Sequence, residues 1–226
     1  MTWSPAVPDG DCRLCPRLAA FRDDNRRGHP DWHNGPVPSF GDLDAPLLIV
    51  GLAPGLRGAN ATGRPFTGDW AGDLLYETLL ALGAATGRYQ KQADDGLSLN
   101  GCRISNAVRC VPPANRPTPA EGRACRLFLA AEMVAMSNLR AILALGGFAH
   151  DSVLAARGGL RKADFPFAHG KNHELPDGLR LIDSYHCSRL NTNTGRLTAD
   201  MFRQVAAAAI AAASSSKRRE GSPGLE

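Results

Sequence analysis

Four short, apolar-rich runs divide the chain into regular units. They cover residues 47–52, 103–108, 141–145 and 179–184, and a segment long enough to hold a helix separates each run from the next. Runs of this length are typical of buried strands, and strands that alternate with helices form parallel sheets. The pattern predicts a three-layer α/β/α sandwich around a short central parallel sheet of four strands.

Apolar positions spaced three and four residues apart predict helices in the intervening segments. The spacing is clearest over residues 72–82, 119–136 and 198–213. Thr118 directly precedes the second of these segments, and threonine is a favoured N-cap residue because its hydroxyl can accept a hydrogen bond from a free backbone N–H group.

Length and composition indicate the number of domains and the class of protein. A chain of 226 residues with 43% hydrophobic and 21% charged residues is ordinary for one globular domain. We expect that domain to cover residues 11–213, between a flexible N-terminus (1–10) and a disordered basic tail (214–226). The chain has neither an apolar stretch of bilayer length nor the basic-then-apolar order of a signal peptide. We therefore expect a cytoplasmic monomer without membrane contact.

Three of the loops that follow the predicted strands carry polar and glycine-rich sequence. They are residues 51–69, 106–113 and 186–196. Because the carboxyl ends of parallel strands meet at one edge of a sheet, we expect these loops to face a single cleft. The first loop can bring backbone N–H groups, the ring of Phe66 and the carboxylate of Asp69 to a ligand.

Taken singly, the polar and aromatic residues of these loops have simpler explanations. Asp69 precedes a predicted helix and could act only as its N-cap. Phe66 could belong to the core, His186 could be a hydrogen-bonded histidine at a strand end, and Asn106 could be a turn residue. Their combination at one sheet edge nevertheless favours a binding or catalytic site.

The six cysteines form a second candidate site. Without an export signal, a disulfide scaffold is not expected, and metal ligation or buried thiols are favoured. Cys12 and Cys15 form a Cys-x-x-Cys pair, while Cys110 and Cys125 lie either side of a loop rich in Pro, Asn and Arg. Four thiolates with this spacing suit either zinc or an iron–sulfur cluster.

Three motifs in order along the chain resemble one known family. They are Gly51-Leu52-Ala53-Pro54-Gly55, residues 58–69, and His186 followed by residues 193–198. Together they are similar to the type-5 branch of the uracil-DNA glycosylase superfamily, over about residues 10–212. The resemblance implies a base excision repair enzyme that flips uracil out of double- or single-stranded DNA and hydrolyses its N-glycosidic bond. It also implies activity on other deaminated bases, such as hypoxanthine and xanthine.

The chemistry of that reaction gives each motif residue a role. His186 can donate a hydrogen bond to uracil O2, where negative charge develops as the base departs. Asn106 can recognise the N3–H and O4 edge, and Phe66 can stack on the ring. Asp69 is the only carboxylate in the first motif loop, so it is the candidate to handle the attacking water.

The first turn departs from several other branches of the superfamily. Those branches carry a polar residue near the Pro, whereas this chain has Leu52 and Ala53, which cannot activate water. The resemblance to the type-5 branch places catalysis on Asp69, with Asn106 and His186 contributing, and leaves Gly51, Leu52 and Ala53 as the wall of the base pocket.

The resemblance also decides between the metals. It implies a four-iron, four-sulfur cluster bound by Cys12, Cys15, Cys110 and Cys125, with a structural role. Residues flanking the motif loops are the candidates for DNA contact: four arginines for phosphates, and one leucine to fill the gap left by the flipped base. They are Arg64, Arg116, Arg189, Arg196 and Leu190.

Two alternatives from other functional classes follow from the same residues. One is a noncatalytic nucleic-acid-binding module built on the four-cysteine metal site. The other is a thiol-dependent hydrolase that uses Cys187 beside His186. The second is disfavoured because neighbouring residues at a strand end point to opposite sides.

Overall fold

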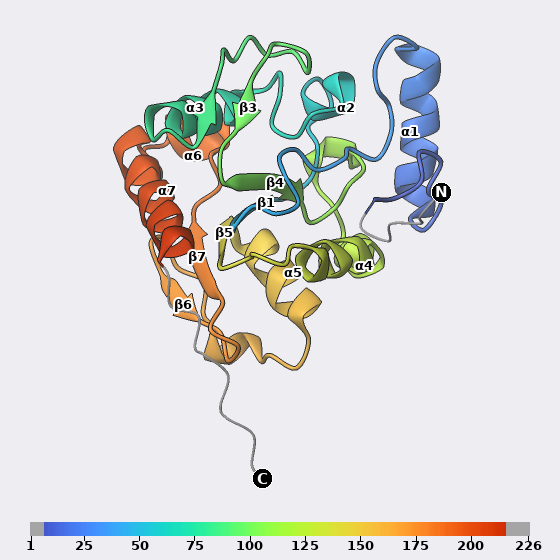
Figure 1. The fold of residues 1–226 in the computed structure, drawn as a ribbon. Coiled ribbons are helices and arrows are strands. Elements are labelled where there is room, and N and C mark those ends of the chain that lie inside the picture. The colour runs from blue at the N-terminus through green and yellow to red at the C-terminus, as the bar shows by residue number, and fades with distance from the viewer. Residues whose placement is uncertain (1–6, 216–226) are drawn as a thin grey trace.

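The computed structural model describes residues 7–215, and its centre is a five-stranded sheet (Figure 1). The strand order is β4 (Cys102–Asn106), β1 (Leu47–Gly51), β5 (Ala141–Leu145), β7 (Arg180–Ser184) and β6 (Asn172–Glu174). The first four strands are parallel and match the four predicted runs. The fifth, β6, pairs antiparallel with β7 at the edge and was not predicted.

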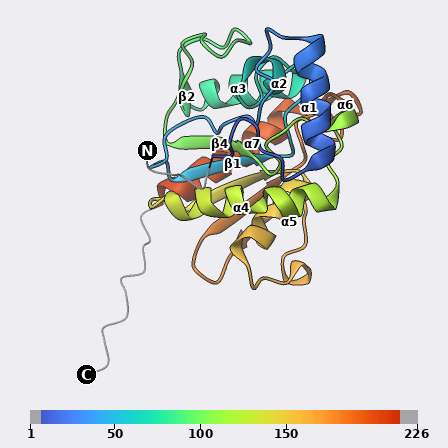
Figure 2. The same ribbon diagram turned by 90° about the vertical axis from the view of Figure 1, so that its right-hand side faces the viewer.

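Helices cover both faces of the sheet (Figure 2). On one face lie α3 (Trp70–Ala81) and α7 (Ala199–Ser214), and on the other lie α4 (Pro119–Ala135) and α5 (Gly147–Arg157). Alternate residues of β1 point into these two cores: Leu47 and Ile49 into the first, Leu48 and Val50 into the second. The predicted α/β/α sandwich is confirmed.

The three predicted helices begin at side-chain caps. Asp69 accepts a hydrogen bond from the N–H of Gly72 at the start of α3, and Thr198 accepts from Met201 at the start of α7. Thr118 and Glu121 form a reciprocal capping box at the start of α4. Local sequence therefore determines where each of these helices starts.

Several shorter or more polar elements complete the structure. They are α1 (Pro16–Gly28), α2 (Ala59–Thr62), α6 (Arg189–Asn193), the pair β2 (Ala85–Thr86) and β3 (Ser98–Leu99), and two 3₁₀ turns, η1 (Pro113–Asn115) and η2 (Lys162–Asp164). The helix α1 is joined to α4 by Arg17, whose guanidinium bonds both carboxylate oxygens of Glu121 at 2.7 and 2.8 Å.

The expected flexible ends fall mostly on residues 1–6 and 216–226, which lie outside the described residues. The single domain over residues 11–213, the monomeric state and the cytoplasmic location stay predictions. Within residues 7–215, no helix is both long enough and apolar enough to cross a bilayer.

Candidate functional site

The carboxyl ends of the parallel strands open into a cavity of about 470 Å³. The loops after β1 and β7 contribute to it as expected, and Asn115 extends the expected second loop into its wall. The loop after β5 also contributes, which the sequence analysis did not include. The residues that line the cavity include Leu52, Ala53, Gly55, Asp69, Gly146, Phe148, His186 and Arg189.

Gly51 ends β1 directly before Leu52, which lines the cleft, but Gly51, Asn106 and Phe66 are not themselves lining residues. In the parallel register, Gly51 lies beside Asn106 at the end of β4. A Cβ atom on Gly51 would collide with both Oδ1 of Asn106 and the ring of Phe66. Glycine at this position therefore allows an amide and an aromatic ring, both buried, to meet over the strand end.

Phe66 adopts a left-handed backbone conformation, with φ of 55°. This is uncommon for a bulky residue and indicates that the surrounding structure holds it in place. The hydroxyl of Tyr76 donates to the carbonyl of Pro65 at 2.6 Å, and Gly72 has no side chain to obstruct the Phe66 carbonyl. The ring lies 6.1 Å from that of His186, centroid to centroid, at 27°.

The oxygens of Asp69 have different surroundings. Oδ1 accepts the N–H of Gly72 at 3.0 Å, which caps α3. Oδ2 faces Gly55 and Gly58, where an added Cβ atom would lie 2.8 and 2.7 Å from it. Burial raises the pKa of Asp69 above its ordinary value, and the Gly72 N–H partly opposes this. Asp69 is thus both a helix cap and a carboxylate with one oxygen available beside the cleft.

His186 follows β7 and forms the opposite wall of the cleft, partly accessible but surrounded by protein. Burial lowers the pKa of His186 to about 4 because the charged form loses hydration. The imidazole is therefore neutral at neutral pH and keeps one N–H to donate.

Asn106 is the one residue of this set whose polar atom is left unsatisfied. Its side chain is 3% exposed, and Oδ1 has no hydrogen-bond partner within the described part of the chain. A buried carbonyl oxygen without a donor costs free energy unless a ligand supplies one. The end of β4 therefore holds a buried acceptor that no described protein group satisfies.

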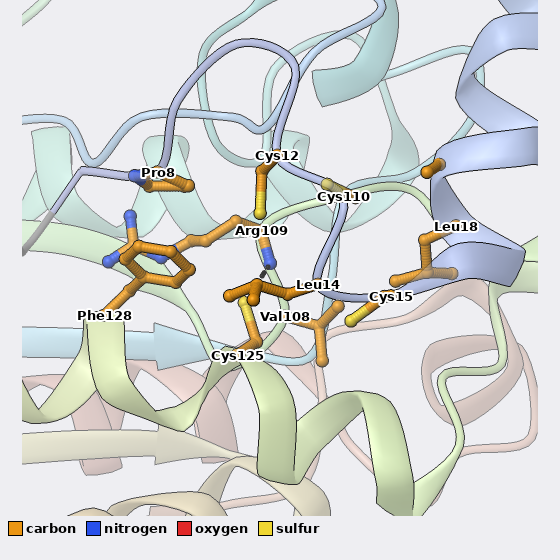
Figure 3. A pocket seen from close by; sticks show the side chains of 11 residues that line it. Pro8, Cys12, Leu14, Cys15, Leu18, Val108, Arg109, Cys110, Cys125 and Phe128 are labelled. Atoms are coloured by element: carbon orange, nitrogen blue, oxygen red, sulfur yellow. Dashed lines mark hydrogen bonds between the residues drawn. The ribbon is translucent and has the colours of Figure 1, made fainter.

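The four predicted metal-binding cysteines line one small cavity of about 10 Å³ (Figure 3). Cys12 and Cys15 come from the segment before α1, Cys110 from the loop after β4, and Cys125 from α4. Their sulfur atoms surround a shared space, and the backbone N–H of Arg109 donates to Sγ of Cys125 at 3.3 Å. The fold thus brings together two pairs that are about a hundred residues apart in the sequence.

The two remaining cysteines lie elsewhere and are buried. Cys187 is wholly enclosed, and burial raises the pKa of its thiol far above the usual value. A thiol that is buried and protonated is a poor nucleophile. The geometry therefore gives no support to a thiol-dependent hydrolase. Burial likewise raises the pKa of Cys102 to about 12.

A further buried cluster joins α5 to β7 behind the cleft. Asp183 bonds Nδ1 of His150 at 2.7 Å and Nε2 of His173 at 3.2 Å. The other ring nitrogen of His150 lies 2.8 Å from the carbonyl oxygen of Phe165, so both nitrogens face acceptors. Burial opposes a charge on His150, but the bond to Asp183 outweighs it and raises the pKa of the imidazole. The arrangement fits an ion pair better than a metal site, because a metal ligand needs a free nitrogen lone pair.

Comparison with known proteins identifies the family. Residues 38–209 match the family model for the uracil DNA glycosylase superfamily, and this range contains the five-stranded sheet and the loops of the cleft. The chain belongs to the uracil-DNA glycosylase superfamily. The resemblance carried by its motifs is confirmed.

Three relatives named type-5 uracil-DNA glycosylase each align with 86% of the chain. The protein of Thermus thermophilus is 48% identical over 200 residues, which cover 90% of that protein. Those of Mycobacterium tuberculosis and Pyrobaculum aerophilum are 44% and 40% identical over 201 and 199 residues, which cover 75% and 86% of their lengths. These relatives agree with the type-5 branch indicated by the motifs.

In this superfamily member, one residue predicted to contact DNA is in the wrong place for it. Arg64 is 4% exposed, and its guanidinium bonds both carboxylate oxygens of Asp95 at 2.7 and 2.8 Å. Its Nε also donates to Oγ1 of Thr67 at 2.7 Å. Arg64 therefore braces the first motif loop from inside, and we correct the expectation that it binds a phosphate.

The other predicted DNA-contacting residues of this superfamily member are exposed. Arg189 lines the mouth of the cleft with its guanidinium 5.6 Å from the ring of Trp70, and Leu190 is 73% exposed on α6. Arg116 follows η1, and Arg196 lies 4.4 Å over the ring of Tyr185. These four side chains are accessible, as a role at a DNA surface requires.

Part of the cleft wall was not predicted from the sequence. Gly146 and Phe148 follow the predicted strand at residues 141–145, so the sheet-edge rule could have found them. They were missed because neither carries a side chain with obvious chemistry. Trp70, half exposed at the rim, had no signal beyond its position next to Asp69.

Proposed function

We propose that this chain is a DNA repair glycosylase that hydrolyses the N-glycosidic bond of uracil in DNA and leaves an abasic site. The observation that carries the proposal is the buried, unpartnered Oδ1 of Asn106, next to the ring of Phe66 at the end of β1. The names of the type-5 relatives support the same activity. A nucleic-acid-binding module without catalysis would need neither this acceptor nor Asp69.

Asn106 selects the base in this proposal. Its Oδ1 accepts from N3–H of a flipped uracil, while its amide nitrogen donates to O4. Cytosine presents the inverted pattern and would leave the buried amide unpaired, which costs far more than the loss of a surface contact. Phe66 supplies a stacking face for the extrahelical ring.

His186 stabilises the departing base. Negative charge accumulates on uracil O2 as the glycosidic bond breaks, and a neutral imidazole can donate its N–H to that oxygen. With a pKa of about 4, His186 is poorly suited to transfer a full proton at neutral pH. Uracil is therefore expected to leave as a hydrogen-bonded anion.

Asp69 completes the reaction on the sugar side. Its Oδ2 lies beside the cleft, so the carboxylate can orient a water molecule and take its proton, and its charge stabilises the cationic sugar. The raised pKa makes this carboxylate a better base than an exposed aspartate. Neither Leu52 nor Ala53 could replace it.

Other deaminated bases fit the same recognition pattern. Hypoxanthine and xanthine also carry an N–H group next to a carbonyl, which the amide of Asn106 can pair with. The open side of the cleft, bordered by Gly146 and Phe148, could accommodate the second ring of a purine. We extend the proposal to these bases, in double- or single-stranded DNA, with the exposed residues Arg116, Arg189, Leu190 and Arg196 on the DNA side.

The cofactor is a separate part of the proposal: a four-iron, four-sulfur cluster on Cys12, Cys15, Cys110 and Cys125. Among residues 7–215, no three of these sulfur atoms lie within 4.8 Å of one another. Four thiolates on one zinc ion lie only roughly 3.8 Å apart, given Zn–S bonds of about 2.3 Å. The sulfur atoms are therefore not arranged as a closed zinc site, and the resemblance to the type-5 branch is what favours the cluster.

The bound cluster would act as a structural crosslink, since glycosidic hydrolysis transfers no electrons. The cysteines themselves come from the segment before α1, the loop after β4 and the first turns of α4. Joining them fixes the N-terminal segment and the loop that carries Asn115 into the cleft wall.

The test is a single-turnover assay on oligonucleotides with one uracil, hypoxanthine, xanthine or cytosine, followed by alkaline cleavage of abasic sites. We expect product from uracil and none from cytosine. An oligonucleotide with N3-methyluracil probes Asn106 directly, because it lacks the N–H that Oδ1 would accept. It should react at least about a hundredfold more slowly than uracil. No product from any deaminated base would contradict the proposed activity.

A further inference from the structure

Among residues 7–215, one buried arginine stands out because it forms no ion pair with a carboxylate. Arg22 lies on the inner face of α1 beside Leu18 and Ala19 and is 1% exposed. Its Nη1 donates to the carbonyl oxygen of Cys12 at 3.0 Å and lies 3.9 Å from Sγ of Cys110. Within residues 7–215, its Nε and Nη2 have no hydrogen-bond partner.

The other buried arginines show what Arg22 lacks. Arg64 is paired with Asp95 and Arg109 with Glu132, each through a buried ion pair. The carboxylates closest to Arg22 in sequence have other partners: Asp11 pairs with Arg26, and Asp23 pairs with Arg13. The charge of Arg22 helps to lower the pKa of Asp11 and Asp23, but among residues 7–215 it forms an ion pair with neither. A buried guanidinium without a bonded counter-ion is unfavourable, so an anion is expected next to Arg22.

We infer that Arg22 is the counter-ion of the metal group held by the four cysteines, and that it sets the reduction potential and the retention of that group. The inference rests on the proposed cofactor. Four thiolates would give the bound group a net negative charge. Arg22 lies behind the residues that line the cysteine cavity and supplies a fixed positive charge, with Nη1 3.9 Å from Sγ of Cys110.

The sign of the effect follows from electrostatics. A nearby cation favours the form of a cluster that carries the extra electron, so it raises the reduction potential. The same positive charge stabilises the cysteines as thiolates, and iron bound to them is therefore released more slowly. Arg22 does not line the cleft and would not contact the base, so it acts as a positioning residue for the cofactor and not as a catalytic one.

The test compares two substitutions on one helix in the full-length, iron-loaded protein. Arg22→Gln removes the buried charge. Arg27→Gln removes an exposed charge, paired with Asp24, five positions further along α1. We expect Arg22→Gln to shift the midpoint potential to a more negative value and to release iron to a chelator about tenfold faster than wild type. Arg27→Gln should match wild type in both measurements.

A third variant separates charge from packing. Arg22→Lys keeps the positive charge without the planar fork, so it should retain iron and keep a potential close to that of wild type. If Arg22→Gln does not fold, Arg22→Lys by itself tests the inference. Rapid loss of iron from Arg22→Lys would overturn it. Unchanged potential and unchanged iron release in Arg22→Gln would overturn it as well.

The results that would contradict the cofactor differ from those that would contradict only the role of Arg22. A wild-type protein that excises uracil but is purified without iron would contradict the cofactor, and the role of Arg22 with it. If the wild-type protein has a full cluster and Arg22→Gln matches it in midpoint potential and iron release, only the role of Arg22 is contradicted. At equal iron content, uracil excision by Arg22→Gln should equal that of wild type.

Discussion

The base cleft and the cysteine cavity are stabilised in different ways. In the cleft, protein groups hold one another: Arg64 bonds Asp95 and Thr67, and Tyr76 bonds Pro65. Oδ1 of Asn106, next to Gly51 and the ring of Phe66, is the buried acceptor that has no partner among residues 7–215. Beside the cysteine cavity, Nε and Nη2 of the buried Arg22 have no hydrogen-bond partner among residues 7–215. Pairing within the chain therefore accounts for the buried polar groups that brace the first motif loop, whereas we proposed a bound group for the cysteine cavity.

The largest expected effect lies in the cleft. Asp69→Asn should lower the rate of base excision by about two to four orders of magnitude, because it removes the group that handles the water. DNA affinity should change little. Single-turnover rates and fluorescence anisotropy would measure the two quantities separately. The matched control is Asp73→Asn, one turn later on α3, where the carboxylate bonds Lys91 at 2.8 Å. Equal losses of rate and affinity would contradict a chemical role for Asp69.

The same residue should control the acid side of the pH profile. Because the pKa of Asp69 is raised, protonation should reduce activity at a higher pH than expected for an exposed aspartate. His186, with a pKa of about 4, stays neutral over most of that range. The acid limb should disappear in Asp69→Asn, and a limb that persists in that variant would assign it to another group.

The next largest effect is on the free energy of unfolding, and it tests whether the Arg64–Asp95 ion pair stabilises the first motif loop. Asp95→Asn leaves Arg64 as an uncompensated buried charge and should lower the free energy of unfolding by about 3 kcal/mol. Asp151→Asn, at an exposed pair with Lys162, should change it by less than about 1 kcal/mol. Urea denaturation measures both, and similar values for the two variants would show that the brace is unimportant.

The Arg64–Asp95 pair also predicts a pH dependence of stability. Burial alone would raise the pKa of Asp95, but Arg64 and two backbone N–H groups hold it at about 2. A carboxyl with a depressed pKa stabilises the fold above its unfolded pKa, and the contribution is lost as pH falls from about 4 to 2. Asp95→Asn should flatten the stability curve in that interval.

A smaller effect, on amide exchange, tests whether the base cleft is stable independently of the cysteine cavity. Cys125→Ser should abolish iron binding and raise amide exchange in α1 by about tenfold or more, while exchange in β1 stays near the wild-type rate. Cys102→Ala, which removes a buried thiol outside the cavity, is the control and should keep its iron. Equal loosening of β1 and α1 in Cys125→Ser would show that the cleft depends on the cofactor.

The smallest expected effect is on the salt dependence of DNA affinity. Arg116→Gln should reduce the slope of log affinity against log salt concentration by about one, as expected when one phosphate contact is lost. Arg161→Gln, at an exposed site paired with Asp164 on η2, serves as the control. An unchanged slope in Arg116→Gln would remove Arg116 from the DNA surface.

Much of the fold was predictable because its signals are local. Buried parallel strands are continuous apolar runs, and the caps at Asp69, Thr118 and Thr198 are short-range patterns. The strand β6 escaped prediction because it is three residues long and has exposed polar residues at both ends. The helix α1 escaped because charged residues dominate its sequence, and its buried face includes Arg22 and Asn25.

By itself, the sequence determined the order of strands and helices, the family, and the candidate residues Asp69, Asn106 and His186. Only the tertiary structure decided which charges are available. Arg64 and Arg189 look equivalent in sequence, yet one is enclosed with Asp95 and the other lines the mouth of the cleft. Burial and pairing depend on contacts between residues far apart in the chain. These contacts determine whether a charge is enclosed in an ion pair, exposed at the cleft or, like Arg22, buried without an ion-pair partner among residues 7–215.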